Sequence, residues 1–314
     1  MHMAWFSKKK AQPGWMAIST DHDAIRLAHV SRTALGKPRV DRWGIVKHNE
    51  TNGAELEQAA KQHEFARYRC ATLLHPAEYQ LLMVDAPNVP RDELKAALRW
   101  RVKDLLEYHV DDATMDVLDI PVDKDAPGKT HYMYAVAAKN AIVQGQIAKF
   151  ERAHIALQVI DIPETAQRNI AQLYETADRG IGMLSFDHAG GLFTLSFEGE
   201  LYLARRLDLS WRQLAGAQEG QRQTYFERIA VELQRSLDHF ERQYQSVTLS
   251  ELLLGPMPED IGLQAFLSSQ LYLPLRQINL ADALEFAGND MGVDQQWQLL
   301  HVLGAALRVE AKVL

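Results

Sequence analysis

The chain of 314 residues is long enough for two domains, and its 47% hydrophobic and 24% charged residues are ordinary values for a globular protein. A formal net charge of −7 excludes a strong overall attraction to nucleic acid. The single cysteine, Cys70, excludes an internal disulfide and a thiolate zinc cluster, and no apolar run reaches the roughly 20 residues that a membrane-spanning helix needs.

Residues 1–14 form a leader that precedes the first predicted strand. It ends in Pro and Gly, carries Lys8, Lys9 and Lys10, and lacks the apolar segment of a signal peptide. We therefore expect a flexible basic leader. Weak attraction of the three lysines to an anionic membrane surface is the alternative.

Residues 15–30 and 182–208 share one pattern: an apolar or alternating run, a short polar turn and a second run. The turns read Ser-Thr-Asp-His-Asp at 19–23 and Asp-His-Ala-Gly-Gly at 187–191. Polar turns between such runs are typical of β-hairpins. The repeated hairpin predicts two related lobes that face each other, with a site for a ligand or partner between them.

The remaining pattern mixes strands and helices, which predicts α/β layers. Further strands are predicted over 39–46, 69–74, 79–84, 115–120, 131–137, 157–163, 247–254 and 275–278, and helices over 55–64, 91–106, 139–154, 164–175, 226–244, 261–271 and 295–307. We place lobe I at 15–178, with an inserted α/β subdomain at about 70–140, and lobe II at 179–314. The C-terminal helix, 295–309, is expected to pack back toward lobe I.

Two adjoining segments resemble a known family. Residues 79–90 read Tyr-Gln-Leu-Leu-Met-Val-Asp-Ala-Pro-Asn-Val-Pro, and residues 93–104 read Glu-Leu-Lys-Ala-Ala-Leu-Arg-Trp-Arg-Val-Lys-Asp. They resemble the strand, the Pro-x-Val-Pro turn and the Glu-Leu-x-x-Ala-x-Arg-Trp helix of PilM and of the cytoplasmic part of GspL, and within this family the MSHA pilus biogenesis proteins. Residues 117–121 and 303–308 fit as well. The resemblance implies a bilobal actin-like (ribonuclease H-like) ATPase fold with an inserted PilM-type subdomain.

In that family, the resemblance implies, an Asp and a Gly in each hairpin turn let a metal ion and backbone N–H groups approach nucleotide phosphates. Here Ser19 and Asp21, and again Ser185 and Asp187, stand at those two places, and Gly255-Pro256 replaces a Gly-Gly pair. We therefore expect a degenerate cleft with no catalytic residue and no cofactor; bound ATP with Mg²⁺ is the alternative. Its residues are Ser19, Asp21, Asp23, Ser185, Asp187, Gly190, Gly191, Gly255 and Pro256.

Asp21-His22-Asp23 and Asp187-His188 together could form a metal site, but Asp and His are also common turn residues. The ordinary interpretation is favoured, and no metal site is predicted.

The resemblance implies a partner-binding role. PilM-like proteins bind the short cytoplasmic peptide of a PilN-like bitopic inner-membrane protein, and the helix over 91–106 offers Arg99, Trp100, Arg101 and Lys103 for such a contact. The alternative for Trp100 is a place in the core.

We expect a non-catalytic scaffold of a type IV (MSHA-like) pilus or type II secretion-like platform, in the bacterial cytoplasm, peripheral to the inner membrane. It would meet the membrane only through its partners, which include other platform proteins and no nucleic acid. The alternatives are an actin-like ATPase that uses Asp21, Asp187 and a shifted metal site, and an unrelated α/β enzyme with scattered carboxylates and histidines.

Overall fold

The computed structural model describes residues 12–21, 23–32, 36–47, 54–90, 93–122, 130–288 and 291–309. Residues 1–11 of the predicted leader therefore lie outside the described residues. The strands are β1 Trp15–Thr20, β2 Ala24–Ser31, β3 Arg39–Lys47, β4 Arg69–Leu73, β5 Tyr79–Asp85, β6 Ala113–Asp119, β7 Tyr132–Lys139, β8 Leu157–Asp161, β9 Gly180–Phe186, β10 Gly191–Phe197, β11 Glu200–Leu207, β12 Leu249–Leu254, β13 Leu275–Gln277 and β14 Glu285–Phe286. The helices are α1 Ala54–Gln62, α2 Leu94–Val102, α3 Asn140–Arg152, α4 Pro163–Ala171, α5 Trp211–Gly216, α6 Glu219–Gln243, α7 Leu263–Gln270 and α8 Val293–Ala306. The predicted mixed α/β class is confirmed.

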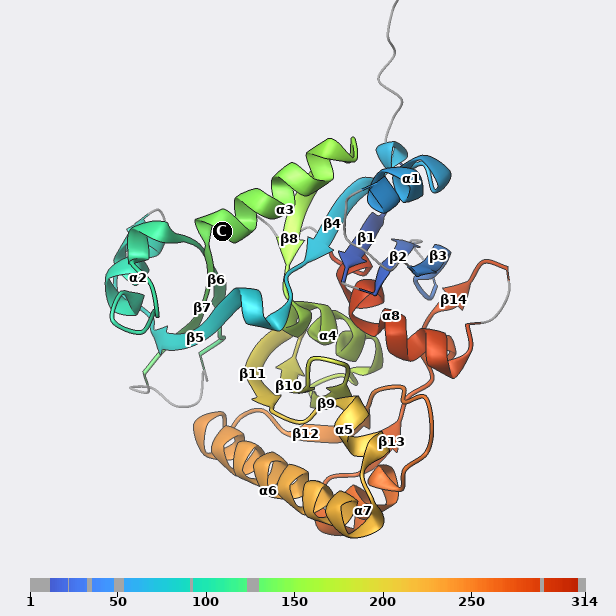
Figure 1. The fold of residues 1–314 in the computed structure, drawn as a ribbon. Helices are drawn as coiled ribbons and strands as arrows, with labels where there is room; N and C mark the ends of the chain where they lie inside the picture. The colour runs from blue at the N-terminus through green and yellow to red at the C-terminus, as the bar shows by residue number, and fades with distance from the viewer. Residues whose placement is uncertain are drawn as a thin grey trace, which may run out of the picture.

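Two large sheets repeat one topology (Figure 1). The first-lobe sheet has the order β14-β3-β2-β1-β4-β8, and the second-lobe sheet has the order β11-β10-β9-β12-β13. In each, an antiparallel three-stranded meander is extended on one side by two parallel strands. The first-lobe sheet has in addition the short strand β14, which pairs in parallel with β3. Both predicted hairpins are confirmed as the pairs β1–β2 and β9–β10.

Helices α4 and α8 lie between the two sheets (Figure 1). Their apolar side chains form one core with residues of both lobes, because Ala17 and Ala28 of the first sheet and Met183 of the second belong to the same buried cluster. The helices cross closely at Gly304, whose carbonyl accepts a hydrogen bond from the Asn169 side chain at 2.9 Å. Helix α8 therefore contacts lobe I although it follows the second-lobe sheet in the chain.

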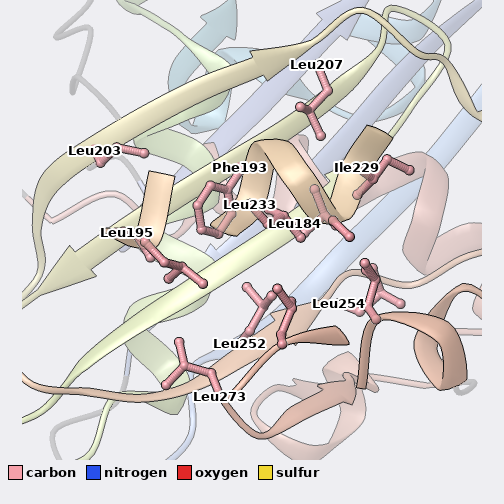
Figure 2. Packing of buried hydrophobic residues seen from close by; sticks show 14 of the residues in the cluster. Leu184, Phe193, Leu195, Leu203, Leu207, Ile229, Leu233, Leu252, Leu254 and Leu273 are labelled. Atoms are coloured by element: carbon pink, nitrogen blue, oxygen red, sulfur yellow. The ribbon is translucent and has the colours of Figure 1, made fainter. Parts of the chain in front are cut away.

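The outer face of the second-lobe sheet is covered by α6, as the regular apolar spacing over 226–244 predicts (Figure 2). Leu184, Phe193 and Leu252 of the sheet pack with Ile229 and Leu233 of the helix in one fully buried cluster (Figure 2). This core makes the second lobe a rigid support for the turn between β9 and β10.

The inserted subdomain is a three-stranded sheet in the order β5-β7-β6 with α2 on one face. We call residues 79–139 the insert. The predicted start near residue 70 is corrected, because β4 is hydrogen-bonded between β1 and β8 and belongs to the first-lobe sheet. The face opposite α2 packs against lobe II, where Ile120 and Tyr134 share a buried cluster with Tyr202 and Leu203. The insert thus contacts both lobes.

Helix α2 is shorter than the predicted 91–106. In the described residues it begins at Leu94 and ends at Val102, after which the chain turns. The Arg99 guanidinium donates to the carbonyl oxygens of Val110 at 2.7 Å and Ala113 at 3.2 Å, which holds the following loop against the helix. Within the described part of the chain, no helix is both long and apolar enough to cross a membrane.

Candidate functional site

A cleft of about 470 Å³ lies where the turns of the two hairpins approach each other. Four of the nine predicted cleft residues line it: Ser19, Asp21, Asp23 and Asp187. Helix α8 contributes Trp297 and His301, and the segment after β4 contributes Leu74, His75 and Glu78. The repeated hairpins therefore do bring their polar turns to one shared cavity.

In the first turn, both carboxylates are bound by a cation of the protein itself. Arg26 lies on β2, and only 7% of its side chain is exposed. Its Nη1 donates to Asp21 Oδ2 at 2.6 Å, and its Nη2 donates to Asp23 Oδ2 at 3.2 Å. A buried guanidinium needs such partners because an uncompensated charge is costly to bury. Both carboxylates of the turn are thus paired with one arginine of the same hairpin, which leaves a net charge of −1.

In the second turn, the Asp187 carboxylate occupies the backbone donors of its own loop. Asp187 Oδ1 accepts hydrogen bonds from the N–H groups of Ala189 at 2.7 Å and Gly190 at 3.0 Å. Convergent backbone N–H groups are the donors that a bound phosphate would otherwise use. Asp187 Oδ2 lies 3.6 Å from His301 Nδ1, so both carboxylate oxygens have neighbours in the protein.

The other predicted cleft residues lie outside the cavity lining. Ser185 is buried, and its hydroxyl donates to Gln167 Oε1 at 2.5 Å. Gly255 and Pro256 are buried beyond β12, and Gly255 N–H donates to Leu184 O at 2.8 Å within the sheet.

The two glycines of the second turn have a packing reason. Gly190 has φ +151°, and a Cβ there would lie 2.8 Å from Leu207 O. A Cβ at Gly191 would lie 2.7 Å from Phe186 Cε1. A side chain at either position would clash with a neighbouring residue of the second-lobe sheet, which explains why both residues are glycine.

Sequence reasoning missed a buried ion pair beside the cleft. Glu164, 2% exposed in the first turn of α4, accepts from Arg206 Nε of β11 at 3.0 Å and from the hydroxyl of Tyr79 of β5. Arg206 Nη2 donates to the Tyr79 hydroxyl at 2.9 Å. Burial raises the pKa of Tyr79, and Glu164 adds to the rise; burial opposes the Arg206 charge, but Glu164 raises its pKa overall. We call Tyr79, Glu164 and Arg206 the joint, since they link insert, α4 and lobe II.

Helices α4 and α8 each contribute one further polar residue near the cleft, Gln167 and His301. Gln167 is fully buried and its amide donates to Met183 O, Leu192 O and Thr194 Oγ1, at 2.9 to 3.1 Å. His301 lies between Gln167 and Asp187, and burial lowers its pKa although Asp187 opposes the shift. His301 lies in an apolar helix, which is a sequence signal, whereas Gln167 lies among the polar residues of α4 and offers none.

The resemblance implies Mg²⁺ and a nucleotide, so the groups that could bind them are compared with the contacts these groups make in the structure. The second turn has its N–H donors bound to Asp187, and the cation of the first turn is held by two carboxylates. Among the described residues, no group of three His, Cys, Asp or Glu side chains is arranged to hold a metal ion. His22, which belongs to the alternative metal site of the sequence analysis, lies outside them.

The predicted partner-binding residues on α2 divide into two kinds. Trp100 is 73% exposed, so the alternative that it belongs to the core is wrong. Lys103 Nζ lies 5.4 Å from the centre of its ring. Arg99 is bound to the loop after the helix, as described above, and Arg101 lies 3.9 Å from Asp85. Arg99 and Arg101 therefore contact other parts of the insert, whereas Trp100 and Lys103 contact each other on its outer surface.

Comparisons with known proteins give the fold. No family model and no curated protein sequence matches the chain. A chain of the solved "PilM-PilN type IV pilus biogenesis complex" is similar, with 19% identity, a TM-score of 0.70 and coverage of 96% of this chain and 97% of that one. The actin-like ATPase fold expected from the sequence is confirmed.

Two weaker similarities extend over most of the chain. The cytoplasmic domain of EpsL, an inner-membrane component of the type II secretion system of Vibrio cholerae, is 13% identical with a TM-score of 0.48, covering 91% of this chain and 93% of that one. A protein of unknown function with an actin-like ATPase fold from Bacteroides thetaiotaomicron is 11% identical, with a TM-score of 0.49. The similarity covers 95% of this chain and 99% of that one.

Proposed function

We propose that this chain is a non-catalytic cytoplasmic scaffold of a type IV pilus or type II secretion-like platform, peripheral to the inner membrane. The observation that carries the proposal is the state of the cleft: Arg26 is bound by Asp21 and Asp23, and Asp187 binds the N–H groups of its own turn. With these donors occupied, the cleft would not bind a nucleotide, and the protein would act by binding partners on its outer surface.

The proposed partner is the cytoplasmic segment of a PilN-like bitopic membrane protein. The fold similarity to a chain of the PilM-PilN complex supports this partner. The sequence resemblance to the MSHA pilus biogenesis proteins, of which MshI is the one proposed here, supports an MSHA-type pilus. The contact surface we propose is the outer face of α2, where Ala96, Ala97 and Lys103 surround Trp100 on the side away from the insert sheet. Trp is among the residue types enriched at the centres of protein interfaces, and Trp100 is 73% exposed.

Trp100→Ala is expected to weaken binding of the partner's cytoplasmic peptide by at least about tenfold, because a central interface Trp contributes about 2 kcal/mol or more. Isothermal titration calorimetry with that peptide measures the change. Lys95→Gln is the matched control on the same helix, since Lys95 pairs with Asp116 at 2.7 Å beside the sheet. Equal affinity of the wild-type protein and a folded Trp100→Ala variant would remove α2 from the interface.

Replacing Arg99 would not test this surface. Its guanidinium holds the carbonyl oxygens of Val110 and Ala113, so a change there would disturb the insert itself.

A further inference from the structure

A second hollow, of about 270 Å³, lies between the insert and lobe II, on the face of the insert opposite α2. Strands β5 and β7 form one wall, and β11 with the C-terminal end of α6 forms the other. We call it the tyrosine groove, after Tyr132, Tyr134, Tyr202 and Tyr244, which line it. It is separate from the cleft between the lobes, because the two cavities share no lining residue.

The four tyrosines converge on one another. The rings of Tyr202 and Tyr244 lie 4.9 Å apart at 88°. Burial raises the pKa of Tyr244, and the neighbouring hydroxyls of Tyr134, Tyr202 and Tyr132 raise it further. Clustered phenols that resist ionisation remain hydrogen-bond donors. The Tyr134 hydroxyl donates to Tyr202 O at 3.5 Å. The groove also brings the hydroxyl-bearing side chains of Tyr132 and Tyr244 to one small volume.

Among the described residues that line the groove, Arg205 is the one charged side chain. Arg205 and His239 line it, and among the described residues no carboxylate lines it or the shallow hollow that adjoins it at Tyr132, Gln243 and Tyr244. Burial raises the pKa of Tyr134 to about 12, and the charge of Arg205, which lines the same cavity, opposes that shift. Guanidinium and hydroxyl donors together are the groups that bind a carboxylate.

The remaining lining is apolar and open. Met83, which lines the groove, is 45% exposed, and Val122, which lines the adjoining hollow, is 47% exposed. Strand β11 is the edge of the second-lobe sheet, and its outward backbone already forms a hydrogen bond from Ala204 N–H to the Tyr134 hydroxyl at 3.1 Å. A ligand here would meet donors at the tyrosines and apolar surface at Met83 and Val122.

We propose that the tyrosine groove binds an extended segment of a partner protein that carries one acidic side chain between apolar residues. The carboxylate would accept hydrogen bonds from Arg205 and from the hydroxyls of Tyr132 and Tyr244, and the flanking apolar side chains would cover Met83 and Val122. This contact is independent of the α2 face, which lies on the other side of the insert.

The test uses the capped peptide acetyl-Ala-Leu-Glu-Leu-Ala-amide and the same peptide with Gln at its centre, each titrated into the full chain by calorimetry. We expect the Glu peptide to bind at least about tenfold more tightly, because hydrogen bonds to a charged group are stronger than neutral ones. Arg205→Gln should abolish this preference, and Tyr244→Phe, which removes only a hydroxyl, should reduce it about fivefold.

Arg228→Gln is the matched control, because it removes the same charge from an exposed position on α6 outside the groove. Equal affinity for the two peptides, no binding of either, or the same affinities in Arg205→Gln and Arg228→Gln would overturn the proposal. Trp100→Ala should bind the Glu peptide like the wild-type protein, so a failure here is distinguishable from a failure of the α2 interface.

Discussion

Replacing Glu164 with alanine is expected to lower the free energy of unfolding by about 2–4 kcal/mol. The change leaves Arg206 and the Tyr79 hydroxyl without their shared acceptor. Removing one partner of a buried pair costs about 3–5 kcal/mol. We expect a loss below that range because 31% of the Arg206 side chain is exposed, so water solvates part of the charge that loses its partner. Urea unfolding followed by circular dichroism measures the change.

Two variants give the scale for this measurement. Tyr79→Phe keeps the ion pair and loses one hydroxyl, so we expect a loss of about 1 kcal/mol. Glu232→Gln breaks an exposed pair with Arg235 on α6, and its effect should not exceed about 0.5 kcal/mol. If Glu164→Ala were no more destabilising than Glu232→Gln, the joint would not hold the insert, α4 and lobe II together.

Replacing Gly304 with alanine is expected to destabilise the protein by about 3 kcal/mol or more. A Cβ at this position would lie 2.1 Å from the carbonyl oxygen and 2.6 Å from the carbonyl carbon of Ala166. Those atoms are backbone of α4 and cannot rotate away, so the two helices between the lobes must move apart. Overpacking of this kind costs more than the helix propensity gained, which is about 1 kcal/mol.

Gly145→Ala is the control for Gly304→Ala. Gly145 lies within α3, and a Cβ there would meet no atom within 4 Å. The same substitution should therefore stabilise the protein by about 0.5–1 kcal/mol, because alanine is the better helix former. Opposite signs for the two variants in one denaturation series would support the close crossing of α4 and α8; a neutral or stabilising Gly304→Ala would contradict it.

The layer arrangement was predictable because it depends on local patterns. The alternating runs and polar turns at 15–30 and 182–208 predicted the hairpins, and the apolar spacing over 226–244 predicted α6. Strand β11 and helix α5 were not predicted as elements of their own. Their pairing and packing depend on contacts with β10 and α8 that local periodicity does not contain.

The site was less predictable, because its contacts join distant residues. The sequence placed Asp21 and Asp187 in the turns but did not predict what their carboxylates bind. Arg26, a cation within an apolar strand, was a signal that could have been used, since Asp21 and Asp23 lie only a few residues away. Glu164 offered no such signal: its partners lie on β5 and β11, and only the folded chain brings them together.

The central claim, that the cleft is not a nucleotide site while an outer surface binds a partner, is tested most directly by one calorimetric comparison. The purified chain is titrated with Mg-ATP and, separately, with the cytoplasmic peptide of a PilN-like protein. We predict saturable binding of the peptide and no Mg-ATP binding tighter than about 1 mM. Saturable Mg-ATP binding in the micromolar range, with no binding of the peptide, would contradict the account.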